Sequence, residues 1–191
     1  MKTYRITSPD DPKLFPLWDI YCHSFPEVEQ RTLADHKAAL QDQGFHCRAL
    51  VENDTVQGLL LFWDFEQVGS GLRYIEHFAL APEARSGGRG SRVLRAFAEE
   101  RPELLLMLEI DPLDTDIARR RLQFYERLGY VMNEPTYWHP PYQPEHTDYP
   151  LLLLSLGRAM RREERTGFEQ AVHDVAMRYA MGAGETGYRS S

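Results

Sequence analysis

The residues best suited to chemistry form a glycine-rich segment at positions 85–91, between a strand-like run that ends at Pro82 and a helix-like pattern. The first turn of a helix has unpaired N–H groups and a partial positive charge, and glycines let a phosphate approach the backbone closely. A strand, a glycine turn and a helix start in this order therefore predict a phosphate or pyrophosphate site. The segment lacks the Gly-Lys-Ser/Thr of a Walker A loop, so that motif is excluded. A dinucleotide-binding Gly-x-Gly-x-x-Gly loop is excluded as well, because Val93 stands where its third glycine is needed.

Two other segments, residues 74–82 and residues 121–130, accompany this glycine-rich segment, and together the three resemble the GNAT superfamily of N-acetyltransferases. Residues 85–90 have the order Arg-x-x-Gly-x-Gly, which is similar to the family's coenzyme A pyrophosphate loop, Gln/Arg-x-x-Gly-x-Gly/Ala. Residues 74–82 look like the family's splayed central strand, and residues 121–130 resemble its Phe-Tyr-Glu-x-x-Gly-Phe block. About 35 residues separate Gly90 from Tyr125, which is the length that an intervening helix and strand require.

The resemblance implies an α/β fold of the GNAT type: a single mixed central β-sheet flanked by helices, with splayed central strands. The apolar stripe of residues 158–181 adds an extra C-terminal helix beyond the usual core of the family. The resemblance also implies acetyl-CoA as the co-substrate, with the pantetheine arm on backbone groups of the central strand and the phosphates at the glycine turn. The residues expected to contact acetyl-CoA are Phe78, Ala79, Leu80, Arg85, Ser86, Gly87, Gly88, Arg89, Gly90 and Ser91. The seven histidines show no His-x-x-x-His spacing, so no metal is expected.

The reaction that the resemblance implies is acyl transfer from a coenzyme A thioester to a primary amine by direct attack. An alkyl amine has a pKa of about 10.4, so a base or desolvation must help to form the neutral nucleophile. The departing sulfur needs a proton donor, and Tyr125, which matches the tyrosine of the Phe-Tyr-Glu block, is the expected general acid. Glu76 on the central strand is the expected base, and Glu109 on the next strand is the other candidate. His77 should point to the opposite face of the sheet and be a core histidine.

The acceptor site is expected at a loop rich in proline and aromatic residues, at positions 138–148, which joins the last two strands. Trp138, His139 and Tyr142 suggest a wall for an apolar or cationic acceptor. The acceptor is either a small-molecule amine or a protein amine. Two other interpretations stay open: a module that binds coenzyme A or acyl-CoA as a sensor without catalysis, and an interaction protein whose glycine turn binds nothing.

Composition narrows the partners and the compartment. The chain has 22 basic and 29 acidic residues, a net charge of −7, which disfavours nucleic acid and suits a cationic or amine substrate. Cys22 and Cys47 form no CxxC pair and are too few for a disulfide scaffold. The N-terminus has no apolar signal sequence, and the longest apolar runs, at residues 59–63 and 104–108, are much shorter than a bilayer span. A cytoplasmic protein without a membrane partner is therefore expected.

Hydrophobic periodicity places these residues on alternating elements of one domain, residues 1–157. Helices are predicted at residues 12–25, 27–43, 87–100, 116–128 and 158–181, and strands at residues 4–7, 45–52, 56–65, 72–81, 104–110, 130–137 and 149–156. Asp111, Asp114 or Asp116 should cap the helix that carries Tyr125. The apolar stripe of residues 158–181 should either pack on the same domain or form the interface of a homodimer. Residues 182–191 are predicted to be a flexible tail.

Overall fold

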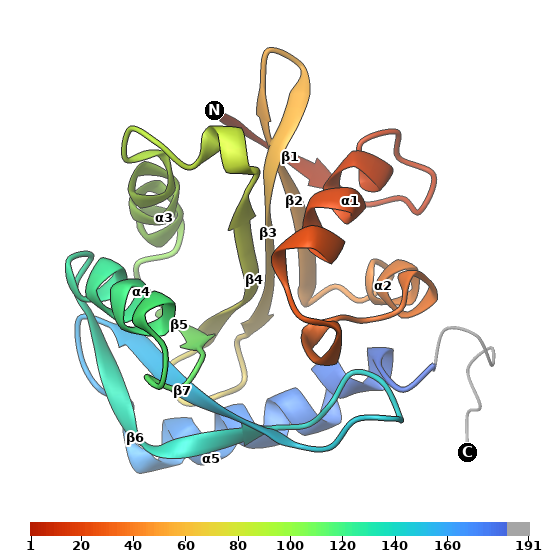
Figure 1. Ribbon diagram of the computed structural model, residues 1–191. Helices are drawn as coiled ribbons and strands as arrows, with labels where there is room; N and C mark the ends of the chain where they lie inside the picture. The colour runs from red at the N-terminus through yellow and green to blue at the C-terminus, as the bar shows by residue number, and fades with distance from the viewer. Residues whose placement is uncertain (183–191) are drawn as a thin grey trace.

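The strand predicted at residues 104–110 lies inside a seven-stranded mixed sheet in the computed structural model, which describes residues 1–182 (Figure 1). The strands are β1 (Lys2–Ile6), β2 (Phe45–Glu52), β3 (Thr55–Phe65), β4 (Leu72–Leu80), β5 (Leu105–Ile110), β6 (Tyr130–His139) and β7 (Tyr149–Leu156). Their order in the sheet is β1-β2-β3-β4-β5-β7-β6. β4 and β5 pair in parallel, and the other neighbours pair antiparallel. The mixed sheet predicted from the resemblance is confirmed.

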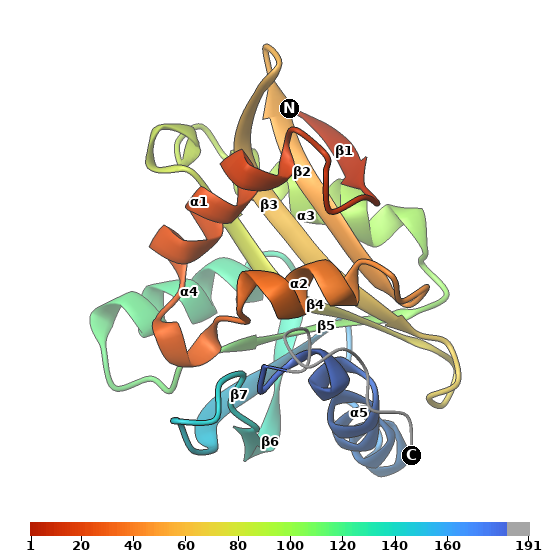
Figure 2. The same cartoon turned by 90° about the vertical axis from the view of Figure 1, so that its right-hand side faces the viewer.

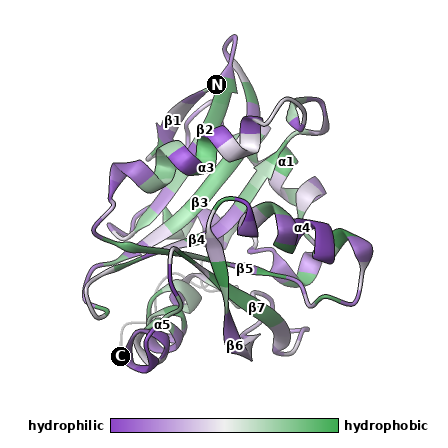
Figure 3. Ribbon diagram, turned by 90° about the vertical axis from the view of Figure 1, so that its left-hand side faces the viewer, coloured by the Kyte–Doolittle hydropathy of each residue, from purple (hydrophilic) through white to green (hydrophobic). Residues whose placement is uncertain are grey.

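Helices cover both faces of this sheet. They are α1 (Leu14–Ser24), α2 (Leu33–Ala39), α3 (Arg89–Glu100), α4 (Asp116–Glu126) and α5 (Arg162–Asp174), with 3-10 turns η1 (Glu27–Glu29), η2 (Pro82–Ala84) and η3 (Ala176–Tyr179). α1 and α2 lie on one face (Figure 2), and α3 and α4 lie on the other (Figure 3). α5 contributes to the same core as α1 and α2 and lies below α2 in the view of Figure 2. No helix within residues 1–182 combines the length and apolar character that a membrane span requires.

Each face of the sheet has its own hydrophobic core. The core under α1 and α2 contains Tyr21 and Trp63, and the core under α3 and α4 contains Phe97 and Leu108. Phe168 of α5 is fully buried in the first of these cores. The apolar stripe of α5 therefore packs on its own chain. Of the predicted tail, residues 183–191 lie outside the described residues.

The sheet opens between its two parallel strands. The pairing of β4 with β5 ends at Ile75 and Leu108, although β4 continues to Leu80. Beyond Ile75, the backbone groups of β4 on the β5 side therefore have no neighbouring strand. This gap is the splay that the resemblance predicted, and it leaves polar backbone groups free to bind an extended ligand.

A β-bulge lies at the point where the strands separate. Leu61 of β3 faces His77, whereas the next residue, Phe62, faces Ile75, so Glu76 is an extra residue in β4. A bulge bends its strand and breaks the alternation of side chains between the two faces. The bulge therefore accounts for both the direction of β4 and the placement of Glu76 and His77.

The helix predicted at residues 27–43 is interrupted. η1 forms one turn, and Gln30 and Thr32 then have extended backbone. The Thr32 side chain accepts a hydrogen bond from the N–H of Asp35 (3.1 Å) and caps α2, and an N-cap residue requires a non-helical conformation. The break carries Arg31 into the interior, where only 2% of the residue is exposed.

Three other boundaries differ from the predicted ones. Thr115, rather than an aspartate, caps α4, because it is the last extended residue and accepts a hydrogen bond from the N–H of Ala118 (3.1 Å). β6 extends to His139 because it pairs with β7 as far as Tyr149, so Trp138 and His139 belong to a strand. The C-terminal helical region is split into α5 and η3 rather than one helix over residues 158–181.

Candidate active site

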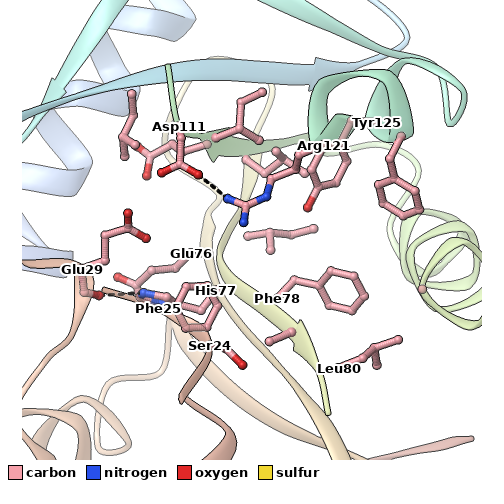
Figure 4. A pocket seen from close by; sticks show the side chains of 18 of the residues that line it. Ser24, Phe25, Glu29, Glu76, His77, Phe78, Leu80, Asp111, Arg121 and Tyr125 are labelled. Atoms are coloured by element: carbon pink, nitrogen blue, oxygen red, sulfur yellow. Dashed lines mark hydrogen bonds and ion pairs between the residues drawn. The ribbon is translucent and has the colours of Figure 1, made fainter. Parts of the chain in front are cut away.

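A cavity of about 420 Å³ opens where β4 and β5 separate (Figure 4). Residues of both strands line it, together with the glycine turn, α4, η1 and the segment around Tyr142. In Figure 4, Tyr125 and Phe78 lie on one side of the cavity, and Glu29 lies on the other. The cavity therefore joins the phosphate site predicted from the sequence to a region rich in carboxylates.

The glycine turn borders this cavity at the start of α3. Gly87 and Gly88 both have positive φ, 65° and 67°, a conformation that costs glycine little and other residues much more. A Cβ at Gly87 would meet no atom within 4 Å, so the space beside the turn is open. Gly88, Arg89, Gly90 and Ser91 line the cavity, and N–H groups in the first turn of a helix have no intrahelical acceptor. The turn therefore fits a pyrophosphate.

The structure brings most of the predicted acetyl-CoA contacts to the cavity, namely Phe78, Ala79, Leu80, Arg85, Gly88, Arg89, Gly90 and Ser91. Ser86 and Gly87 belong to the turn but do not line the cavity. Arg85 Nε donates a hydrogen bond to the carbonyl of Leu80 (2.9 Å), which fixes the turn to the end of β4. Arg89 Nη1 lies 3.4 Å from Glu52 Oε2, so its guanidinium already has an anionic neighbour.

Tyr125 of α4 lines the cavity and is 8% exposed. Its ring packs edge-on against Phe124 and Tyr130. Burial raises the pKa of its phenol to about 12, against a smaller opposing effect of Arg121. No hydrogen bond within residues 1–182 engages its hydroxyl group. The phenol is therefore protonated at neutral pH and free to donate to a ligand in the cavity.

Glu76, the expected base, is committed to other partners. Arg31 Nη1 and Nη2 both donate to its carboxylate, the second at 2.7 Å, and the hydroxyl of Tyr142 donates to Oε1 (2.9 Å). The side chains of Arg31 and Glu76 are both 0% exposed. Burial alone would raise the pKa of Glu76, but the ion pair with Arg31 outweighs it and holds that pKa well below its usual range. This geometry favours a positioning role over a proton-accepting one.

Glu109, the other candidate base, is differently placed. Its Oε2 accepts a hydrogen bond from the hydroxyl of Tyr74 (2.7 Å), whereas Oε1 is buried and has no hydrogen-bond partner among the described residues. Burial raises the pKa of Glu109 to about 8; the hydrogen bond from Tyr74 opposes this, and the charges of Glu76 and Glu29 add to it. The side chain is 7% exposed and lines the cavity. Its free oxygen therefore suits an N–H donor brought in by a ligand.

His77 does not point to the opposite face from Glu76, contrary to the prediction. Its ring packs edge-on against Tyr21 and Phe25 on the α1 side of the sheet, the side on which Glu76 meets Arg31. The bulge at Glu76 is the reason, because it breaks the strict alternation of a strand. Nε2 of His77 lies 2.9 Å from the backbone carbonyl of Glu29, so this histidine anchors η1.

Of the three predicted acceptor residues, only Tyr142 lines the cavity. Trp138 is 60% exposed and borders another groove, between β6 and α5. His139 is buried behind the cavity wall, with Nε2 3.4 Å from the hydroxyl of Tyr142, and burial lowers its pKa to about 4. Trp138 and His139 point away from each other because they are consecutive residues of β6.

Sequence reasoning missed Arg31 and Glu29, which both belong to this site. Arg31 falls within the helix predicted at residues 27–43, and no local signal distinguishes it from a solvated arginine. Glu29 is the last residue of the short turn η1, and the direction of its backbone depends on the anchor from His77. Within residues 1–182, no group of three or more His, Cys, Asp or Glu side chains is arranged to hold a metal ion.

An open mixed sheet, a glycine turn at a helix start beside the opening and a buried tyrosine that faces it define the GNAT type of acetyltransferase fold. The sequence model of the Acetyltransferase (GNAT) family matches residues 14–130, and the chain belongs to this family. No curated protein matches the chain.

Solved structures extend this similarity over most of the chain. A protein from Bacteroides thetaiotaomicron, assigned to the GNAT family of acetyltransferases, covers 93% of this chain and 98% of its own, with 26% identity and a TM-score of 0.81. The ribosomal-protein-S18-alanine N-acetyltransferase from Escherichia coli covers 84% and 95%, with 15% identity and a TM-score of 0.59. An aminoglycoside 6'-N-acetyltransferase complexed with coenzyme A covers 81% and 96%, with 17% identity and a TM-score of 0.59. The last two similarities concern the fold alone.

Proposed function

We propose that the chain is an N-acetyltransferase that transfers the acetyl group of acetyl-CoA to a primary amine of a small molecule or a protein by direct attack. The observation that carries the proposal is the meeting of three groups in one cavity: the free phenol of Tyr125, the unpartnered carboxyl group of Glu109 and the part of the glycine turn that lines the cavity, residues 88–91. Family membership supports the reaction class. So do the names of two fold neighbours, which are both N-acetyltransferases.

The donor is proposed to enter along the open edge of β4. The pyrophosphate of acetyl-CoA would meet the N–H groups at the start of α3, where the positive end of the helix dipole favours an anion. The pantetheine arm would take the place of a strand beside residues 78–80, where β5 no longer pairs with β4. A fold neighbour that was solved with coenzyme A supports this choice of donor.

Glu109 is the base that we favour, and Tyr125 is the acid. The amine nitrogen forms a bond to the acyl carbon, the carbon–sulfur bond breaks, and its electron pair stays with the sulfur. The carboxylate of Glu109 takes the proton that the amine loses, and Tyr125 donates a proton to the sulfur, which gives an acetamide and the thiol of coenzyme A. A carboxyl group with a pKa of about 8 suits proton transfer near neutral pH.

Glu76 is proposed to position the site. Its carboxylate holds the hydroxyl of Tyr142 at 2.9 Å and neutralises Arg31. Its negative charge also raises the pKa of Glu109. Glu76 therefore helps to keep the pKa of Glu109 high enough for Glu109 to accept a proton, and Glu76 does not accept one itself.

Calorimetric titration of the folded protein with acetyl-CoA tests the donor site, with dephospho-CoA and ATP as controls. We expect saturable binding that prefers acetyl-CoA. Release of the coenzyme A thiol in the presence of primary amines then tests the transfer. Absence of binding in a protein shown to be folded would contradict the donor site, and binding without thiol release for any amine would identify an acyl-CoA-binding module instead.

A further inference from the structure

Four carboxylate side chains line the part of the cavity away from the glycine turn: Glu29, Glu76, Glu109 and Asp111. Two of them are neutralised. Glu76 is paired with Arg31, and Oδ2 of Asp111 lies 2.5 Å from Nη1 of Arg121. The other two, Glu29 and Glu109, have no Arg or Lys partner within residues 1–182. The cavity therefore contains two carboxyl groups that lack a cation.

Glu29 is held firmly in place by its backbone. Its carbonyl accepts a hydrogen bond from the hydroxyl of Tyr21 (3.3 Å) and lies 2.9 Å from Nε2 of His77. Its side chain points toward Asp111 across the cavity (Figure 4). Burial raises the pKa of Glu29 to about 7, and the charge of Asp111 adds to the rise, whereas Arg121 opposes it. A cation placed between the carboxylates of Glu29 and Asp111 would offset the cost of ionising Glu29 in this buried, negatively charged place.

Glu109 provides a second and independent sign of a ligand. Its Oε1 is buried, lacks a hydrogen-bond partner among the described residues, and belongs to a side chain that lines the cavity. A buried polar atom left without a partner is costly. Once the carboxyl group has lost its proton, this oxygen needs a hydrogen-bond donor, and an amine N–H supplies one.

We propose that the acceptor is a small amine with a second cationic nitrogen, in which Glu29 holds the second ammonium group while the reacting nitrogen meets Glu109. This inference rests on the proposed acetyl transfer and narrows its acceptor. An acceptor that carries a carboxylate beside its amine fits less well, because Arg31 and Arg121 are already paired. The acceptor is small because a cavity of about 420 Å³ must also admit the thioester end of the donor.

A panel of matched amines tests the inference. Linear α,ω-diaminoalkanes, diaminosugars, n-alkylamines of the same length and ω-amino acids are compared by kcat/KM for thiol release. We expect the wild-type protein to prefer a dication over the matched monoamine by about tenfold or more, the size of a charge-assisted hydrogen bond. The class of dication with the higher kcat/KM, linear diamines or diaminosugars, identifies the carbon skeleton of the acceptor.

Two variants of η1 locate the source of the preference. Glu29→Gln removes the proposed ammonium partner and should abolish most of the preference for dications. Glu27→Gln makes the same change of charge two residues away, at an exposed position that does not line the cavity, and should keep the preference. Equal kcat/KM for the dication and the monoamine, or a preference that Glu29→Gln leaves intact, would overturn the inference while acetyl transfer itself stands.

A binding measurement separates this inference from the proposed function. Calorimetric titration of the coenzyme A complex with the diamine and the matched monoamine needs no turnover. If no amine is acetylated but the diamine binds more tightly than the monoamine, and only Glu29→Gln removes the difference, then the dication site stands and the transferase proposal fails. If the diamine shows no tighter binding, the dication site is wrong.

Discussion

We expect Tyr125 to act as the acid because its hydroxyl is protonated and faces the cavity rather than a protein partner. Tyr125→Phe keeps the ring contacts with Phe124 and Tyr130 and removes only the donor. We expect turnover to fall by about 10²–10⁴-fold, the usual contribution of a general acid, with little change in acetyl-CoA affinity. Steady-state kinetics and calorimetry on the same variant check both parts.

Tyr130→Phe is the matched control for this change. Tyr130 touches the ring of Tyr125, its buried hydroxyl has no hydrogen-bond partner among the described residues, and it does not line the cavity. Turnover in this variant should stay close to that of the wild type. Undiminished turnover in Tyr125→Phe would remove the acid role from that residue.

The base role that we propose for Glu109 predicts a particular pH dependence. Its raised pKa of about 8 should appear as a limb in the profile of kcat/KM, with activity rising as pH passes through that value. Glu109→Gln should lower kcat/KM by about 10²–10⁴-fold and remove the limb. Tyr74→Phe removes the hydrogen bond that lowers this pKa, so the limb should move to higher pH. A limb that survives in Glu109→Gln would assign the base elsewhere.

The same raised pKa makes folding stability depend on pH. Between about pH 4.5 and 8, Glu109 keeps a proton in the folded chain that the unfolded chain releases, so its stabilisation is complete below this window and is lost as pH rises through 8. This carboxyl group is faced by Tyr74, Glu76, Glu29 and His139. The raised pKa of Glu29 also makes the free energy of unfolding fall as pH rises, up to about pH 7. Urea unfolding should therefore show Glu109→Gln gaining stability relative to the wild type between pH 5 and pH 9. A difference that is constant with pH would contradict the raised pKa.

At the level of elements, the glycine turn is the feature that a single side chain would spoil. Gly88→Val places a branched side chain at φ +67° on the cavity wall and should weaken acetyl-CoA binding strongly in calorimetry. Gly157→Val is the control, because Gly157 also has positive φ (79°) and open space around a Cβ but does not line the cavity. Both variants carry similar backbone strain. An equal loss of acetyl-CoA affinity in the two would therefore show that the phosphates do not bind at this turn.

At the level of the whole molecule, Arg31 ties three distant parts of the chain together. It pairs with Glu76 of β4, and its Nε and Nη2 donate to the carbonyls of Tyr179 (2.8 Å) and Ala176 (3.2 Å) in η3. The segment between α1 and α2, the bulge and the C-terminal region therefore meet at one buried guanidinium group. The proposed acceptor side of the cavity depends on this contact, because Glu76 also holds Tyr142.

Arg31→Met leaves the carboxylate of Glu76 buried without its cation and should lower the free energy of unfolding by about 3–5 kcal/mol. Adding Glu76→Gln to Arg31→Met removes the orphaned charge and should recover part of this loss. Arg101→Met is the control, since Arg101 forms ion pairs on an exposed surface and should change stability far less. Denaturant unfolding of the wild type, the two single variants and the double variant measures the order of their free energies of unfolding. A double variant less stable than Arg31→Met would contradict the pairing argument.

Local signals in the sequence determined the sheet, most of its helices, the glycine turn and the place of Tyr125. These features depend on periodicity, on turn residues and on short spacings, all of which act between neighbours in the chain. The same signals failed at residues 27–43, because the N-cap at Thr32 and the inward turn of Arg31 stabilise a break that helical periodicity does not reveal.

Only the tertiary structure decided which carboxylate is free. Glu76 and Glu109 are both acidic residues on neighbouring central strands, and the sequence offers no means to rank them. A bulge in β4 turns Glu76 toward Arg31, which comes from 45 residues earlier in the chain, whereas Oε1 of Glu109 meets no partner within the described residues. Pairing between distant residues depends on strand register and burial, which are properties of the folded chain and not of any local segment.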